Sequence, residues 1–208
     1  MTGVKKALMR IFENVPDITR TLRARWCLKV IGGQSDDFWL NQLDHDREYI
    51  RAWAVKFLCE DRKPSEDAFQ KFAELAESGN SPFVRLHLAS ALQRIDPSSR
   101  WTIAEALAGR FEDQEDQNLP LMIWYGIEPL VHEDERRFVS LISKAKIAKI
   151  QHFITRRALS LPENKEALAQ LVGLLDQLDG ESQKAVMGGM LVGLEGRTGI
   201  EAPANWAS

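Results

Sequence analysis

The chain has 208 residues, of which 44% are hydrophobic and 27% are charged, and its formal net charge is -3. This length is enough for the core of one or two domains, and the plentiful aliphatic and aromatic residues exclude a disordered chain. No apolar run reaches the roughly 18–20 residues that cross a bilayer, and the slightly acidic balance disfavours a general nucleic-acid binder.

Helix start and stop signals recur along the whole chain, and no segment has the alternating pattern of a strand. The spacing of these signals predicts about eleven helices of ~8–16 residues with short connections. Helix N-termini are expected, in chain order, at Asp17, Ser35, Asp46, Ser65, Ser81, Asp96, Asn118, Asn164 and Ser182. The sequence therefore predicts an all-α fold.

An apolar stripe at positions i, i+3, i+4, i+7 and i+8 begins at Ile50 and recurs after steps of 34, 37 and 29 residues, at Val84, Leu121 and Ile150. Such a stripe is one face of an amphipathic helix, and a second amphipathic segment follows each copy. The stripes predict a repeated core whose main members are Ile50, Trp53, Phe57, Leu58, Val84, His87, Leu92, Leu121, Trp124 and Phe153.

Paired helices at a loose step are typical of an α-solenoid, in which stacked pairs bury a continuous core. Arg51 and Arg85 occupy the same place in two successive copies, and the variable step favours HEAT-like repeats over tetratricopeptide or ankyrin repeats. We therefore expect a single domain, 1–208, of about five helix pairs. Its parts are an irregular first pair at 1–44, repeats at about 45–79, 80–115, 116–145 and 146–179, and a terminal helix and tail at 180–208.

Glu128 is the least expected residue of the stripes, because its position holds Phe57 and Ala91 in earlier copies. A buried carboxylate needs a partner or must take up a proton. Arg157 occupies the same position in the next copy, so we expect a buried Glu128–Arg157 pair that links two repeats. The alternative is that Pro129 distorts the helix and turns Glu128 toward solvent.

Few residues are candidates for catalysis or metal binding. His132 follows Glu128 by four residues, so the two share a helix face and could hold a metal, with Tyr125 nearby, if a third ligand converged on them. The chain has no HExxH motif, P-loop or nucleophile elbow, and we expect no catalytic, cofactor-binding or metal-binding residue. Cys27 and Cys59 are expected to be buried free thiols without a role.

Two sets of surface residues are candidates for binding. The second helix of each pair would line the concave face of a solenoid, with Gln70, Glu74, Glu105, Arg110 and Arg137 as the expected contacts. A basic stretch could bind an anionic group or an acidic partner, or could simply complement a helix C-terminus, and it contains Lys144, Lys146, Lys149, Arg156 and Arg157. The acidic block 112–116 is expected to be a loop between repeats.

Four stretches resemble one protein family. They are residues 16–33 (PDITRTLRARWCLKVIGG), 45–61 (HDREYIRAWAVKFLCED), 118–131 (NLPLMIWYGIEPLV) and the tail 193–206 (GLEGRTGIEAPANW). Together they resemble the helical middle region of the planctomycete-type membrane-bound dehydrogenase family. The stretch 118–131 is the most specific part of this resemblance.

The resemblance implies a role as one module of a larger exported protein. Members of that family look like chains of three regions. An N-terminal β-propeller, similar to sugar dehydrogenases that use pyrroloquinoline quinone, is followed by HEAT-like repeats and then by a cytochrome c module. It implies a non-catalytic scaffold, periplasmic or exported, that links the propeller to the cytochrome and has these neighbouring domains as partners. Haem c and pyrroloquinoline quinone would be cofactors of the parent, because this chain has no C-x-x-C-H motif and no export signal.

Two other functions remain open at this point. The chain could be a free-standing HEAT-like protein that binds another protein or, against its net charge, a nucleic acid. It could also be a small enzyme or metal site built around Glu128 and His132. We expect no contact of this chain with a membrane.

Overall fold

The computed structural model describes residues 3–32, 34–162 and 164–207, and these residues form twelve α-helices and five 3₁₀-helices without a strand. The predicted all-α class is confirmed. The α-helices are α1 (Gly3–Asn14), α2 (Ile18–Val30), α3 (Asp36–Asn41), α4 (Glu48–Leu58), α5 (Glu66–Ser78), α6 (Pro82–Leu92), α7 (Trp101–Ala108), α8 (Leu119–Ile127), α9 (Glu135–Lys144), α10 (Ala148–Ser160), α11 (Lys165–Leu175) and α12 (Gly180–Gly193). The 3₁₀-helices are η1 (Gln42–Asp44), η2 (Pro97–Ser99), η3 (Phe111–Asp113), η4 (Glu128–His132) and η5 (Ala204–Ala207).

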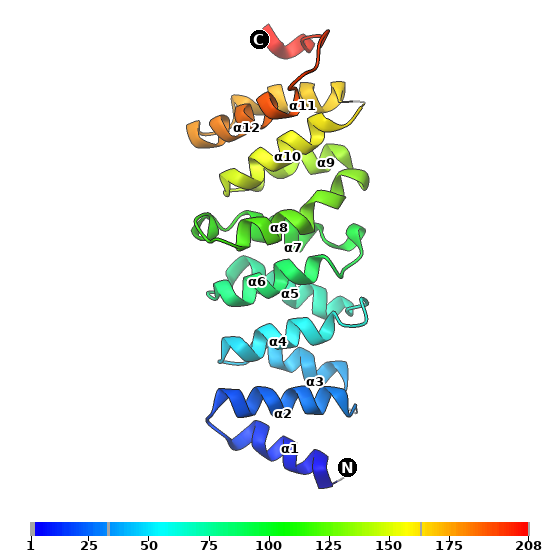
Figure 1. The fold of residues 1–208 in the computed structure, drawn as a ribbon, viewed down its shortest axis with the longest axis vertical. Coiled ribbons are helices and arrows are strands. Elements are labelled where there is room, and N and C mark those ends of the chain that lie inside the picture. Colours follow the sequence, from blue (N-terminus) through cyan, green and yellow to red (C-terminus); the bar gives the residue numbers. More distant parts are fainter. Residues whose placement is uncertain (1–2, 33, 163, 208) are drawn as a thin grey trace.

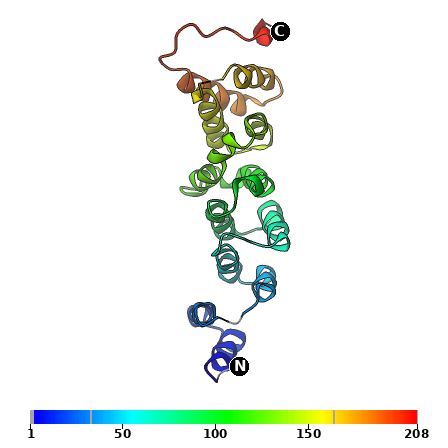
Figure 2. The ribbon, with the colours of Figure 1, turned by 90° about the vertical axis from the view of Figure 1, so that its right-hand side faces the viewer.

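The helices are stacked in chain order along one long axis, with the two termini at opposite ends (Figure 1). Seen from the side, they form two layers (Figure 2). In the first layer α4 packs on α6, α6 on α8, α8 on α10 and α10 on α12. In the second layer α5 packs on α7, α7 on α9 and α9 on α11, so each layer is a continuous row of helices.

Several of the predicted helix N-termini are capped as expected. The side chains of Asp17, Ser35, Ser65 and Ser81 accept hydrogen bonds from main-chain amides at the starts of α2, α3, α5 and α6. Asp96 does the same for η2. These bonds satisfy amides that have no partner within the helix itself.

The helix starts expected at Asn118 and Asn164 are confirmed, although neither side chain caps its helix. The starts expected at Asp46 and Ser182 were wrong, because the N-cap residues of α4 and α12 are Arg47 and Asp179. At the start of α8 the carboxylate of Asp116 accepts from the amides of Asn118 and Leu119, each at 2.8 Å. Asp179, rather than Ser182, caps α12. In both cases an aspartate earlier in the chain supplies the capping carboxylate.

Most of the predicted core residues lie inside the protein. Ile50, Phe57, Leu58, Val84, Leu92 and Trp124 are buried, and Trp53, His87 and Phe153 are half-buried. Leu121 was wrongly placed in the core, because 37% of it is exposed. The buried face of α8 instead carries Leu119, Ile123 and Ile127, which follow one another at steps of four residues from the capped start of the helix.

The same polar link, from a helix to the turn before it, recurs at four points. The buried hydroxyl of Thr21 donates to the carbonyl of Val15 at 3.0 Å, six residues upstream. Arg51 and His45 (2.7 Å), Arg85 and Gly79 (2.7 Å), and Gln151 and Ala145 (2.9 Å) repeat this bond with the same spacing. Each link satisfies a carbonyl in the turn that precedes a first-layer helix, where an unpaired carbonyl out of reach of water would be destabilising.

Arg85 also forms the most deeply buried ion pair described. Its Nε and Nη2 contact the two carboxylate oxygens of Asp113 in η3, each at 2.5 Å, and both side chains are 3% exposed. The hydrogen bonds to Asp113 raise the pKa of Arg85, so the guanidinium stays charged. The acidic block 112–116 was expected to be a loop between repeats, and within it Asp113 turns inward and ties the end of the α6–α7 pair to α6.

Replacing Asp113 with alanine leaves the buried guanidinium of Arg85 without its carboxylate. We expect Asp113→Ala to lower the free energy of unfolding by about 3–5 kcal/mol, measured by urea denaturation. The matched control is Lys71→Met, which removes the exposed Lys71–Asp44 pair (3.0 Å, 38% and 64% exposed) and should cost at most about 1 kcal/mol. Equal losses for the two variants would contradict the assigned role of the Asp113 pair.

Two glycines allow the first-layer helices to approach closely. A Cβ at Gly126 of α8 would lie 2.7 Å from Cβ of Leu92 in α6. A Cβ at Gly189 of α12 would lie 2.6 Å from the main-chain oxygen of His152 and 2.7 Å from Cβ of Thr155, both in α10. Neither contact can be relieved by moving the end of a flexible side chain, so these crossings require glycine.

For this reason Gly189→Ala should force α10 and α12 apart and lower the free energy of unfolding by about 1–3 kcal/mol in a denaturation experiment. Gly188→Ala is the control on the same helix. Its new Cβ meets only the ring of His152, at 3.3 Å, and alanine favours a helix over glycine. A Gly189→Ala protein as stable as Gly188→Ala would show that the crossing is looser than described.

Candidate interaction groove

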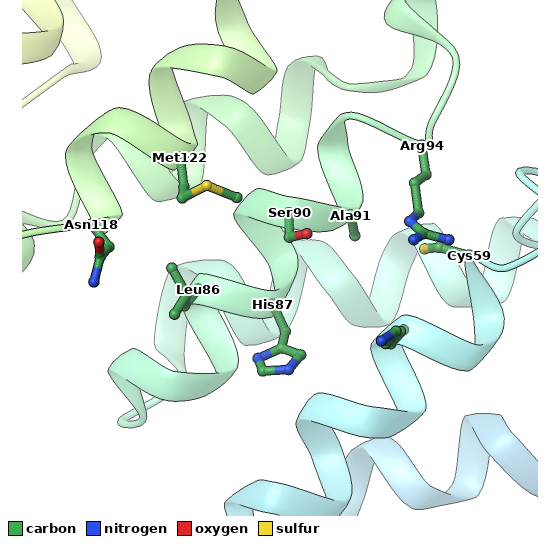
Figure 3. Close-up of a pocket in the computed structure, with 9 residues that line it drawn as sticks. Cys59, Leu86, His87, Ser90, Ala91, Arg94, Asn118 and Met122 are labelled. Carbon is green, nitrogen blue, oxygen red and sulfur yellow. The ribbon is translucent and has the colours of Figure 1, made fainter. Parts of the chain in front are cut away.

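A cavity of about 400 Å³ opens on the first layer, where α4, α6 and the start of α8 meet (Figure 3). Its volume falls in the range of small binding pockets. We call it the α6 groove, and its lining residues are Lys56, Cys59, Leu86, His87, Ser90, Ala91, Arg94, Asn118 and Met122. Of these residues, His87 and Ala91 belong to the repeated stripe, and none of the nine was proposed for binding from the sequence.

The charged residues that line the α6 groove are all basic. Lys56 and Arg94 are exposed, and neither forms an ion pair with a carboxylate of the described residues. The ammonium of Lys56 lies 4.5 Å from the ring centre of Trp53, which attracts a cation without neutralising it. The lining residues of the groove therefore carry positive and no negative charge, with Asp61 the nearby carboxylate that acts on the Cys59 thiol.

His87 supplies a hydrogen-bond acceptor at the same place. Its Nδ1 lies 3.0 Å from the main-chain oxygen of Phe83. Because a carbonyl oxygen can only accept, Nδ1 carries the proton and Nε2 is left as an acceptor. Burial lowers the pKa of His87 and the charge of Lys56 lowers it further, against the opposing effect of the Phe83 contact, so the ring is neutral at neutral pH.

The thiol of Cys59 is buried beside the groove and is not a nucleophile. Burial raises its pKa to about 12, and the thiolate is the reactive form of cysteine. Cys59 agrees with the expectation of a buried free thiol, whereas Cys27 does not, because it is exposed on α2. No stripe was assigned to the irregular first helix pair, so the sequence did not define which face of α2 points inward.

An apolar border extends the groove along α8. Asn118 and Met122 line it, and Leu121 and Tyr125 lie on the same outward face of this helix, 37% and 54% exposed. Residues three and four apart share a helix face, so the four side chains form one row. Exposed aromatic, aliphatic and methionine side chains beside arginine are typical of protein-binding surfaces.

A second groove of about 400 Å³ lies on the second layer, where α5 and α7 meet the side chain of Arg137 from α9. It includes Gln70 and Arg137, two of the predicted concave residues. The guanidinium of Arg137 lies 4.4 Å from the ring centre of Trp101 and 3.1 Å from Glu105. The charges of Arg137 and Glu105 therefore pair with each other within the protein, and Glu66 adds a negative charge to the lining of this groove.

The remaining predicted concave residues also have partners. Gln70 donates to Glu74 at 3.4 Å, an exposed contact along α5. Arg110 donates to the carbonyls of Glu77 and Gly79 at the end of α5, and it also pairs with Glu112. Arg110 therefore satisfies main-chain carbonyls at the C-terminus of α5.

The predicted basic patch divides into residues with different contacts. Lys144 pairs with Glu105 of α7 at 2.5 Å, and the guanidinium of Arg156 lies 5.2 Å from the ring centre of Phe153. Lys146 and Lys149 are exposed. Because Lys144 is already neutralised, the stretch is less basic than its sequence indicates.

The predicted contact between Glu128 and Arg157 is present, at 2.5 Å, but the pair is not buried. The two side chains are 37% and 25% exposed, because Glu128 begins η4 at the end of α8 and does not continue the buried face. Arg157 also lies 3.0 Å from Nε2 of His132. An arginine only donates, so Nε2 of His132 accepts this bond and is occupied.

No metal centre forms around Glu128 and His132 in the described ranges, where no three His, Cys, Asp or Glu side chains gather at metal-binding distance. Tyr125 is on the outward face of α8. Among the described helices, none combines the length and apolar character needed to cross a membrane.

The chain matches no protein-family model, and the comparisons with curated proteins and with solved structures also give no match.

The lowered pKa of His87 links stability to pH. The unfolded chain, with an ordinary histidine pKa of about 6.5, binds this proton more readily than the folded chain. Stability should therefore fall as the pH drops through and below about 6.5. Urea denaturation at pH 7.5 and pH 5.5 should show a smaller decline for His87→Gln than for the unmodified protein, and identical declines would contradict this assignment.

Proposed function

We propose that the chain is a non-catalytic scaffold of HEAT-like repeats, an α-solenoid that binds protein partners along its helical faces. The single observation that carries this proposal is the stack of two helix layers with a groove on each layer. Stacked repeats generate extended surfaces of this kind without an enclosed pocket, and binding is their usual role.

The repeated polar link supports a solenoid more than a simple bundle. Thr21, Arg51, Arg85 and Gln151 each reach a carbonyl six residues upstream, from the four separate helices α2, α4, α6 and α10. A repeated structural unit explains why one bond recurs with one spacing. One α-helix of the first layer and one of the second lie in each of the segments 45–79, 80–115, 116–145 and 146–179. A helix pair therefore fits as the repeated unit.

We also propose, from the resemblance of four sequence stretches, that the scaffold belongs to a larger exported protein of the planctomycete-type membrane-bound dehydrogenase family. There it would hold a β-propeller and a cytochrome c module in a fixed relation. The haem and any pyrroloquinoline quinone would be bound by those modules, and the stiff row of helices would set their separation.

The test is the intact mass and the visible absorption spectrum of the native polypeptide from its source organism. A mass several-fold above 23.6 kDa with a c-type haem spectrum is the expected result. A native mass near 23.6 kDa without haem would contradict the linker role, and would favour a free-standing binding protein. The proposed scaffold role would then depend on partners isolated with the native protein.

A further inference from the structure

We propose that the α6 groove binds an acidic segment of a protein partner, in which carboxylates alternate with apolar side chains. This inference rests on the proposed function as a binding scaffold and specifies the partner's chemistry. The partner would bind to the first layer, whereas the sequence led us to expect binding on the second-layer face.

Charge complementarity is the first argument. Lys56 of α4 and Arg94 after α6 contribute two cations from different helices to one groove, and no acidic residue lines it. Elsewhere in the described structure, the cations Lys71, Arg110 and Lys144 are paired with carboxylates of the chain. A carboxylate of a ligand would supply the missing partner to Lys56 and Arg94, with Arg94 able to bind it through two parallel bonds.

The acceptor on His87 is the second argument. A neutral imidazole with a free Nε2 acceptor does not attract a phosphate or a carboxylate, but it does pair with an N–H group. The main chain of a peptide offers an N–H at every residue other than proline, next to its side chains. The α6 groove thus combines donors for a carboxylate with an acceptor for a main-chain amide.

The apolar lining is the third argument. Leu86, Ala91 and Met122 line the same space (Figure 3). Leu121 and Tyr125 are exposed further along α8. A small inorganic anion would leave this surface uncovered, whereas an apolar side chain beside a carboxylate would cover it. The flexible thioether of Met122 can adapt to side chains of different shape.

Fluorescence anisotropy with two labelled peptides tests the proposal on the full chain. The first probe alternates Glu with Leu and Ser, and the second has Gln in place of every Glu. We expect the acidic peptide to bind about tenfold or more tightly than the Gln peptide, and to weaken as salt is raised. The double variant Lys56→Glu, Arg94→Glu should lose this preference.

The matched control is Lys146→Glu, Lys149→Glu, which changes the net charge equally at exposed positions of the basic stretch. It should keep the preference for the acidic peptide. Equal affinities for the two peptides, no binding of the acidic one, or loss of the preference only in the control variant would each overturn the proposal. None of these outcomes alters the mass or haem content of the native polypeptide, so the two proposals can fail separately.

Discussion

The fold depends on how the protein satisfies the main-chain carbonyls in the turns between its two layers. Each of these turns leads into the next helix of the stack. At four of them a side chain from that helix donates to a carbonyl six residues upstream. The donor differs, being Thr21, Arg51, Arg85 or Gln151, while the spacing does not. Because a hydrogen bond has a preferred length and direction, it helps to set how α2, α4, α6 and α10 leave their turns.

Arg85 shows how this link is extended from one helix pair to the next. It bonds Gly79 before α6 and Asp113 after α7, and Arg110 donates to Gly79 as well. One buried network thus fixes both ends of the second complete pair. α6 is also the central wall of the α6 groove, so the placement of His87 and Arg94 follows from the same bonds that hold the stack together. In this account stability and binding use opposite faces of one helix.

The sequence predicted the parts of the fold that are local. Caps such as Ser65 and Ser81, and the stripe from Ile50 to Leu58, are set by neighbours within one or two turns. It failed where the outcome depended on distant residues. Leu121 was misplaced although the start of α8 was expected correctly, because α6 and α7 decide which face of α8 is covered. Asp113 was expected only as part of a loop between repeats, and its partner Arg85 lies 28 positions away. The α6 groove was missed because Lys56 of α4, Arg94 after α6 and Met122 of α8 come together only when these helices pack.

The helices form an extended two-layer stack and not a compact bundle, and each layer of this stack carries a groove. Small-angle X-ray scattering of the chain in solution tests this most directly. A compact domain of this length would have a radius of gyration of about 17 Å. The account predicts a clearly larger value and an asymmetric distance distribution with a long tail. A radius near 17 Å with a symmetric distribution would contradict the stack and the two proposals built on it.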